Sequence, residues 1–291
     1  MKNASNKTNW TILPIVLFFL LSCVKDAAFY FNRGNDYVDK GKYDQAISDY
    51  TKALEINPRY FWAYVNRGTT YGRKGQYNEA ISDFTKALEI NPRDALAHYN
   101  RGLAYYNKGQ YDQAISDCTK ALEINPRYAA AYYNRGLAYH NRGQYDEAIS
   151  DYNKALEIDP RDALAYCNRG FAYDNKGQYD QAISDYTKAL EINPRYAAAY
   201  NELAWLLATA KEPRIRNGKK AVELALRACE LSDWKNPDYL DTLAAAYARV
   251  DDFGNATKWQ EKALQLFEKG EKAEAQERLN LYREHRPWPL D

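Results

Sequence analysis

Asparagine recurs at one place in each of five 34-residue intervals of the chain. Its carboxamide offers two N–H donors and one oxygen acceptor, so it can hydrogen-bond both sides of a peptide bond. At a fixed spacing, such amides are suited to following an extended peptide backbone. These residues, here called the asparagine ladder, are Asn32, Asn66, Asn100, Asn134 and Asn168. The alternative is that Asn is merely duplicated with its interval and bonds a neighbouring helix.

An arginine follows each ladder asparagine, and an aspartate stands 16 residues beyond each arginine. The pairs are Arg33 with Asp49, Arg67 with Asp83, Arg101 with Asp117, Arg135 with Asp151 and Arg169 with Asp185. Further along the chain both charges disappear together, leaving Leu203 with Leu224 and then Leu243 with Trp259. Joint replacement predicts contact, so we interpret the pairs as structural ion pairs. The alternative is that the arginines bind a ligand carboxylate.

Other catalytic or metal-binding patterns are missing from the sequence. The three histidines fall on separate predicted elements: His98, His140 and His285. None stands near a Cys or carboxylate cluster at ligand spacing, and there is no phosphate-binding glycine loop or nucleophile motif. We therefore expect no enzyme activity, no cofactor and no small-molecule substrate, and we expect His98 to fill the core. Three cysteines in different intervals are expected to be free thiols: Cys118, Cys167 and Cys229.

Prolines mark the period of the intervals. They stand 34 residues apart and are Pro58, Pro92, Pro126, Pro160 and Pro194. Residues 27–196 thus form five near-identical blocks of two helical segments each. This is the sequence signature of an all-α solenoid, in which stacked helix pairs bury a shared core.

Within one block, apolar residues spaced three and four apart predict helices over 129–141 and 146–158. Gly143 is expected to end the first helix in a left-handed conformation, and Asp146 to cap the second. Pro160 ends the second helix and turns the chain into the next block.

Each block has a small residue at its eighth place, Tyr at the eleventh, Ala at the twentieth and twenty-seventh and Pro at the thirty-second. This pattern resembles the tetratricopeptide repeat family. The resemblance implies a right-handed superhelix whose first helices line a concave face. The ladder is similar to that of O-linked N-acetylglucosamine transferases, where asparagines hold an extended peptide. The second, fifth, ninth and twelfth places are then expected to face the same groove, with aromatic anchors at Trp62, Tyr99, Tyr106 and Tyr133.

Beyond the five blocks the period is disturbed but not lost. Residues 197–267 predict two divergent helix pairs, with an inserted loop at 211–220 that contains Pro213. Residues 268–291 predict a capping helix and a tail.

The N-terminus differs from the rest of the chain. Lysines precede an apolar run, so residues 1–22 have the layout of a signal peptide. The run ends in Leu-Leu-Ser-Cys, which resembles the lipobox of bacterial lipoproteins and implies acylation of Cys23 and a short tether over 23–26. An uncleaved N-terminal anchor and simple cleaved secretion are the alternatives. We expect an exported protein held at the membrane.

The overall charge gives little attraction for polyanions. Forty basic and 39 acidic residues leave a net charge of +1, so nucleic acid is not an expected partner. We therefore predict a scaffold that binds extended segments of partner proteins. A self-associating structural spacer is the alternative.

Overall fold

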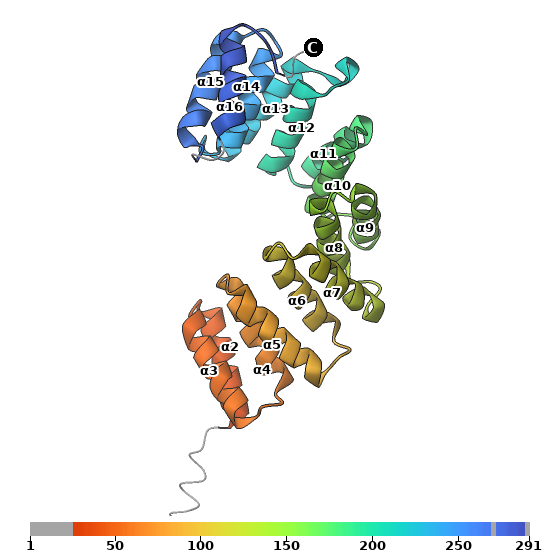
Figure 1. Cartoon of the computed structure of the whole chain (residues 1–291), viewed down its shortest axis with the longest axis vertical. Coiled ribbons are helices and arrows are strands. Elements are labelled where there is room, and N and C mark those ends of the chain that lie inside the picture. Colours follow the sequence, from red (N-terminus) through yellow and green to blue (C-terminus); the bar gives the residue numbers. More distant parts are fainter. Residues whose placement is uncertain (1–25, 269–271, 289–291) are drawn as a thin grey trace, which may run out of the picture. The chain divides into compact units, whose positions relative to one another are not determined.

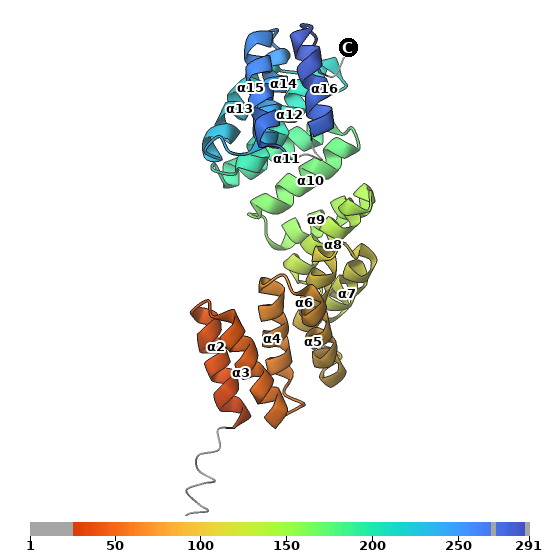
Figure 2. The same cartoon turned by 60° about the vertical axis from the view of Figure 1, so that its left-hand side comes forward.

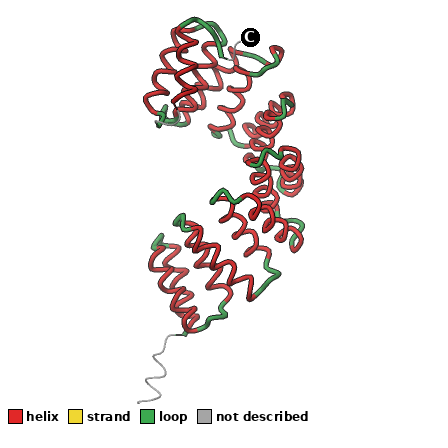
Figure 3. Tube along the Cα trace, viewed as in Figure 1, coloured by secondary structure: helices red, strands yellow, loops and turns green. Residues whose placement is uncertain are grey.

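The chain forms helices, as its sequence predicts. The computed structural model describes residues 26–268 and 272–288, and in these ranges it contains fifteen α-helices, one short 3-10 helix and no strand (Figures 1 and 3). The all-α fold class is confirmed. The predicted signal segment and Cys23 lie outside the described residues.

The five blocks supply α2 to α11. Their first helices are α2 (Ala27–Asp39), α4 (Phe61–Arg73), α6 (Ala95–Asn107), α8 (Ala129–Asn141) and α10 (Ala163–Asn175). Their second helices are α3 (Tyr43–Ile56), α5 (Tyr77–Ile90), α7 (Tyr111–Ile124), α9 (Tyr145–Ile158) and α11 (Tyr179–Ile192). Two further pairs follow, α12 (Ala197–Thr209) with α13 (Gly218–Leu231) and α14 (Pro237–Ala248) with α15 (Phe253–Leu266). The last helix is α16 (Lys272–Arg283).

Glycine acts at two places in each block. Gly143 follows α8 with φ of 73°, a conformation that a residue with a Cβ rarely adopts. Gly136 lies inside α8 against α9, where an added Cβ would stand 2.8 Å from the Tyr152 ring. The predicted cap at Asp146 is wrong, because α9 already begins at Tyr145 and Asp146 lies in its first turn. There Asp146 forms an exposed ion pair with Lys176.

The chain divides into two compact units, the first ending at Ile124 and the second starting at Asn125. In the first unit, α3 packs on α4 and α5 packs on α6, so each block rests on the next (Figures 1 and 2). In the second unit, α9 to α16 are joined by the same kind of contact. The division falls inside the five-block segment 27–196 and not at its end.

The second unit has the larger continuous core. Leu206, Leu240 and Leu243 are at most 1% exposed, and they join Tyr186 in one apolar cluster that runs from α10 to α15. The inserted segment at 211–220 is more ordered than a simple loop. It contains a 3-10 helix, Pro213–Ile215, and α13 begins within it at Gly218.

Candidate functional site

Each block is joined internally by the ion pair that its sequence predicts. Arg67 donates from Nε and from one terminal nitrogen to the two carboxylate oxygens of Asp83, both at 2.7 Å. The other four pairs have the same two-bond geometry, with distances of 2.5 to 2.8 Å. The aspartates are buried, Asp83 being 4% exposed. Such a pair fixes the first helix against the second, since both partners are held in a planar, two-bond arrangement.

In several blocks the arginine also bonds a residue of the preceding block, a contact that the sequence analysis did not predict. The remaining terminal nitrogen of Arg67 donates to Thr51 Oγ1 at 2.8 Å, and that of Arg101 donates to Thr85 Oγ1 at 3.1 Å. In the second unit, Arg169 donates to Asn153 Oδ1 at 2.5 Å. The signal was present, because a Thr or Asn recurs two residues after each aspartate. One side chain therefore ties three helices together.

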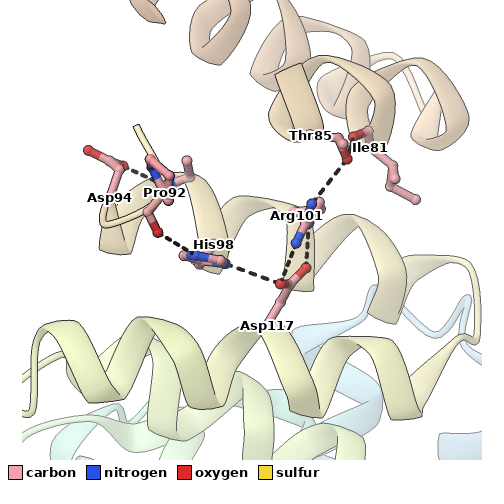
Figure 4. A network of polar contacts seen from close by, with 8 residues as sticks. Ile81, Thr85, Pro92, Asp94, His98, Arg101 and Asp117 are labelled. Atoms are coloured by element: carbon pink, nitrogen blue, oxygen red, sulfur yellow. Dashed lines mark hydrogen bonds and ion pairs between the residues drawn. The ribbon is translucent and has the colours of Figure 1, made fainter. Parts of the chain in front are cut away.

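His98 adds a further bond to one of these pairs (Figure 4). Its Nδ1 lies 3.2 Å from Asp117 Oδ1 and its Nε2 lies 3.1 Å from the Pro92 carbonyl oxygen. The ring is 7% exposed, so it does fill the core, but it also makes polar contacts that the sequence reading did not expect. Burial raises the pKa of Asp117, yet the bonds from Arg101 and His98 outweigh it and leave that pKa lowered. For Asp83, which has only the arginine, burial wins and the pKa is raised.

The later helix pairs fill the same interface with apolar side chains. Leu203 and Leu224 are each 6% exposed and share one cluster with Leu243 and the partly buried Trp259. Both ends of the ion pair are therefore replaced together, by residues of one apolar cluster.

The ladder asparagines do not all have the same surroundings. The side-chain amides of Asn32 and Asn100 make no hydrogen bond within the described part of the chain. Asn66 Nδ2 donates to Asn35 Oδ1 at 2.9 Å, and Asn168 Nδ2 donates to Tyr133 Oη at 3.0 Å, so these two bond a neighbouring first helix. Asn134 is only 7% exposed and donates to the Ala130 carbonyl within its own helix.

Two cavities in the first unit lie beside ladder residues. One, of about 240 Å³, is lined by Asn66 of α4 and by Asn35 of α2. The other, of about 300 Å³, is lined by Asn100 and Leu103 of α6 and by Phe84 of α5. Asn35 is a further site residue that the ladder did not reveal, since it stands at the variable ninth place and also accepts from Tyr50 Oη at 2.7 Å.

The predicted apolar anchors are distributed unevenly. Trp62, at the second place of its block, is 49% exposed. Leu96 and Leu164 stand at the same place of their blocks and are 40% and 50% exposed. Tyr99, Tyr106 and Tyr133 are each only partly exposed. Tyr106 packs near Tyr111 with ring centroids 5.7 Å apart, and Tyr133 packs near Tyr152 at 6.0 Å.

The expectation that the fifth place faces outward is wrong for two blocks. Val65 and Cys167 are 3% and 6% exposed, because this place packs against the adjacent block. Burial also raises the pKa of the Cys167 thiol to about 12, so that group is protonated and unreactive at neutral pH.

A further cavity, of about 810 Å³, belongs to the second unit. It lies among α10, α12, α14 and α16 and is lined by Glu202, Asp174, Asp238, Asp241 and Arg278. Sequence reasoning missed it, although Glu202 stands at the ladder place of the sixth pair.

Other chemical sites do not emerge from the described residues. No three His, Cys, Asp or Glu side chains in residues 26–268 and 272–288 lie together as a metal ion requires. None of Cys118, Cys167 and Cys229 forms a disulfide, as predicted, and all three are buried. None of the helices in these ranges is long and apolar enough to span a bilayer.

The chain matches known repeat models and solved structures. Tetratricopeptide repeat models match residues 95–128, 129–162, 163–196 and 185–221, and a TPR repeat model matches 34–75 and 73–109. The crystal structure of the MamA protein is 34% identical, with 59% of this chain and 93% of that chain covered and a TM-score of 0.54. The structure of YrrB, described as a TPR protein with an unusual peptide-binding site, is 28% identical. The match covers 64% of this chain and 96% of YrrB, with a TM-score of 0.55.

A third structure shows the likeness of the fold alone. A tetratricopeptide repeat protein from Parabacteroides merdae is 21% identical, with 88% of this chain and 98% of that chain covered and a TM-score of 0.62. No curated protein sequence matches significantly. Repeats of this kind generally form non-catalytic scaffolds, and the relatives support a protein-interaction scaffold. The chain belongs to the tetratricopeptide repeat family.

Proposed function

We propose that the first helices of this chain bind extended segments of partner proteins while its N-terminus is tethered to a bacterial envelope membrane. The observation that carries the binding proposal is the pair of cavities in the first unit, each beside a ladder amide. Asn66 borders one and Asn100 borders the other, at equivalent places of successive blocks. A peptide backbone presents donors and acceptors at regular intervals, so repeated amides beside small cavities suit it. YrrB, a relative with a peptide-binding site, supports this mode.

The ladder members differ in what they can offer. Asn100 has no hydrogen-bond partner within the described residues, so its donors and its acceptor are available to a peptide. Asn134 has little exposed surface and is expected to contribute least. The exposed Trp62 and Leu96 stand on the same first helices and would pack against the side chains of the bound segment.

A random 12-residue peptide library displayed on phage tests the binding proposal without knowledge of the partner. Peptides selected on the full-length chain are expected to lose affinity about two- to tenfold for Asn100→Ala, because one net hydrogen bond is removed. Gln113→Ala is the matched control, since Gln113 is an exposed amide on the second helix α7. The proposal fails if no peptide is enriched, or if the two variants bind equally well.

The membrane proposal rests on the sequence of residues 1–23. If Cys23 is acylated, mass spectrometry of the mature protein detects a lipid-modified N-terminal cysteine, and Cys23→Ala moves the chain out of the membrane fraction. An unmodified chain in the soluble fraction would contradict this proposal and leave the binding proposal standing.

A self-associating spacer is less well supported. The second helices carry exposed lysine–glutamate pairs, such as Lys86 with Glu89 at 2.9 Å and Lys154 with Glu157 at 2.8 Å. A hydrated charged surface of this kind does not favour association. A molecular mass that rises with protein concentration would favour the spacer.

A further inference from the structure

We propose that the cavity among α10, α12, α14 and α16 binds the cationic side chain of a lysine or arginine in the partner segment. This inference rests on the peptide-binding function proposed above and names the chemistry of the partner at the second unit. It is built from Glu202, Asp174 and Asn201, which line one cavity of about 810 Å³. A volume of this size falls within the range of ligand-binding clefts, which span roughly 300–1,000 Å³.

Glu202 occupies the sixth place of α12, the place that holds asparagine in all five preceding blocks. A carboxylate only accepts hydrogen bonds, whereas a carboxamide also donates them. The ladder therefore changes here from a group that suits a neutral peptide bond to one that requires a donor. Asp174, at the twelfth place of α10, adds a second carboxylate to the same cavity.

Neither carboxylate has a cationic partner among residues 26–268 and 272–288. The side chain of Glu202 accepts one bond within the described residues, from Asn201 Nδ2 at 3.3 Å, and that of Asp174 accepts none. The cations of the lining are engaged elsewhere or lie at the edge. Arg278 is held by Asp241 at 2.9 Å, Lys176 pairs with Asp146, and Lys211 is exposed.

Asn201 supplies an independent sign of a missing donor. Asn201 is 7% exposed and lines the cavity, yet its buried Oδ1 accepts no hydrogen bond from the part of the chain that the structure describes. A buried acceptor without a partner costs free energy, and a ligand with N–H groups would supply what it lacks. The bond from Asn201 Nδ2 to Glu202 fixes which end of the amide carries the oxygen. Exchanging the amide nitrogen and oxygen therefore does not explain the unpaired Oδ1. An ammonium or guanidinium donates to carboxylate and amide oxygens alike.

The raised pKa values of the two carboxyl groups are consistent with a site that is completed by a cation. Burial raises the pKa of Glu202 to about 7, with smaller contributions from Asp174 and Asp238, and burial raises the pKa of Asp174 to about 6. Burial, and to a smaller extent the charge of Glu202, raise the pKa values of Cys167, Tyr186 and Tyr239, so these groups are neutral near pH 7. A bound cation favours the ionised carboxylates, so affinity is expected to rise as the pH rises from about 5 to 8.

The phage selection, repeated on Glu202→Gln, tests the inference. For the unaltered chain we expect lysine or arginine to be enriched at one position of the selected peptides, and for Glu202→Gln we expect that enrichment to vanish. Glu277→Gln is the control, because it removes an exposed carboxylate of α16 outside the cavity. Circular dichroism establishes that each variant remains helical. Selected peptides without a basic preference would overturn this inference alone, whereas failure to select any peptide would overturn the proposed function as well.

One selected peptide and its norleucine analogue then isolate the contact. Replacing the cationic side chain is expected to weaken binding about tenfold for the unaltered chain and less than about twofold for Glu202→Gln, measured by fluorescence anisotropy. Equal losses for the two proteins would place the cation elsewhere. Free lysine and spermidine are added as competitors. Displacement by either at concentrations near the peptide's Kd would identify a site for small free cations and overturn the assignment to a partner segment.

Discussion

The five blocks and the C-terminal helix pairs use the same two faces of their helices with opposite chemistry. Between first and second helix, the blocks place a buried ion pair, such as Arg67 with Asp83, where the sixth pair has Leu203 and Leu224. On the outer face of the first helix, the blocks carry neutral amides where the sixth pair has Glu202. Two helices can therefore be joined by charge or by apolar contact at one position, while the sixth place of the first helix changes independently from amide to carboxylate.

The interface between the first and second helix of a block shows why the ion pair and the apolar contact are both stable. A buried ion pair recovers its dehydration cost only through complete bonding, and each arginine here makes two bonds to its aspartate. Arg67 and Arg101 also bond the preceding block, a link that leucine cannot provide. The ion pair therefore sets helix geometry and block contact at once, whereas the leucines contribute only packing.

Breaking one ion pair is expected to have the largest effect. Asp83→Ala leaves the guanidinium of Arg67 without its carboxylate and should lower the free energy of unfolding by about 3–5 kcal/mol. Arg67→Leu combined with Asp83→Leu recreates the pairing of the sixth block and is expected to be far less damaging. Urea unfolding followed by circular dichroism compares them. A double variant as unstable as the single one would contradict the comparison.

Placing an ion pair where the sixth helix pair has leucines tests the same comparison in the opposite direction. Leu224→Asp buries a carboxylate without a partner and should cost about 3 kcal/mol. Adding Leu203→Arg supplies the partner and should restore part of the loss. Thermal unfolding of the two variants measures the recovery, and a double variant no more stable than Leu224→Asp would show that the C-terminal interface cannot accept the pair.

On the outer face, Glu202→Gln is expected to stabilise the unbound chain at high pH. The folded pKa of Glu202, about 7, lies above its ordinary value, so the folded state holds the proton more tightly than the unfolded state. Its contribution to stability is therefore present at low pH and is lost as the pH rises toward 7. At pH 8 the gain from Gln should be on the order of 2 kcal/mol, and at pH 4 close to zero. Urea midpoints at the two pH values check this; equal gains would exclude titration of Glu202 as the cause.

A smaller effect is expected at the ion pair between Arg101 and Asp117, to which His98 adds a bond. The pKa of Asp117 is lowered while that of Asp83 is raised. The lowered group contributes stability above its ordinary pKa, which is lost as the pH falls through the folded value. His98→Leu removes one of its bonds, so the pKa of Asp117 should rise and stability at pH 5 should fall by about 1 kcal/mol. Carboxyl NMR titration of the two proteins measures the shift, and an unchanged pKa would show that the histidine is only a packing residue.

The sequence determined the helical period and the ion pairs. Spacings of three and four residues, a proline every 34 and glycine after each first helix leave the chain few alternatives to stacked helix pairs. The joint loss of both charges at Leu203 and Leu224 identified a contact, because a buried charge is not tolerated alone. These constraints act within one helix or between two residues, so residue types and spacings are enough to predict them.

Only the tertiary structure decided which of the equivalent positions in the blocks are exposed. Val65 and Cys167 share a place with Tyr99 but are buried, and Asn134 is enclosed while Asn100 is not. Exposure of this kind depends on the shape of neighbouring blocks, which no single block encodes. The cavity around Glu202 likewise gathers carboxylates from α10, α12 and α14, which are far apart in the chain, because packing brings these helices together.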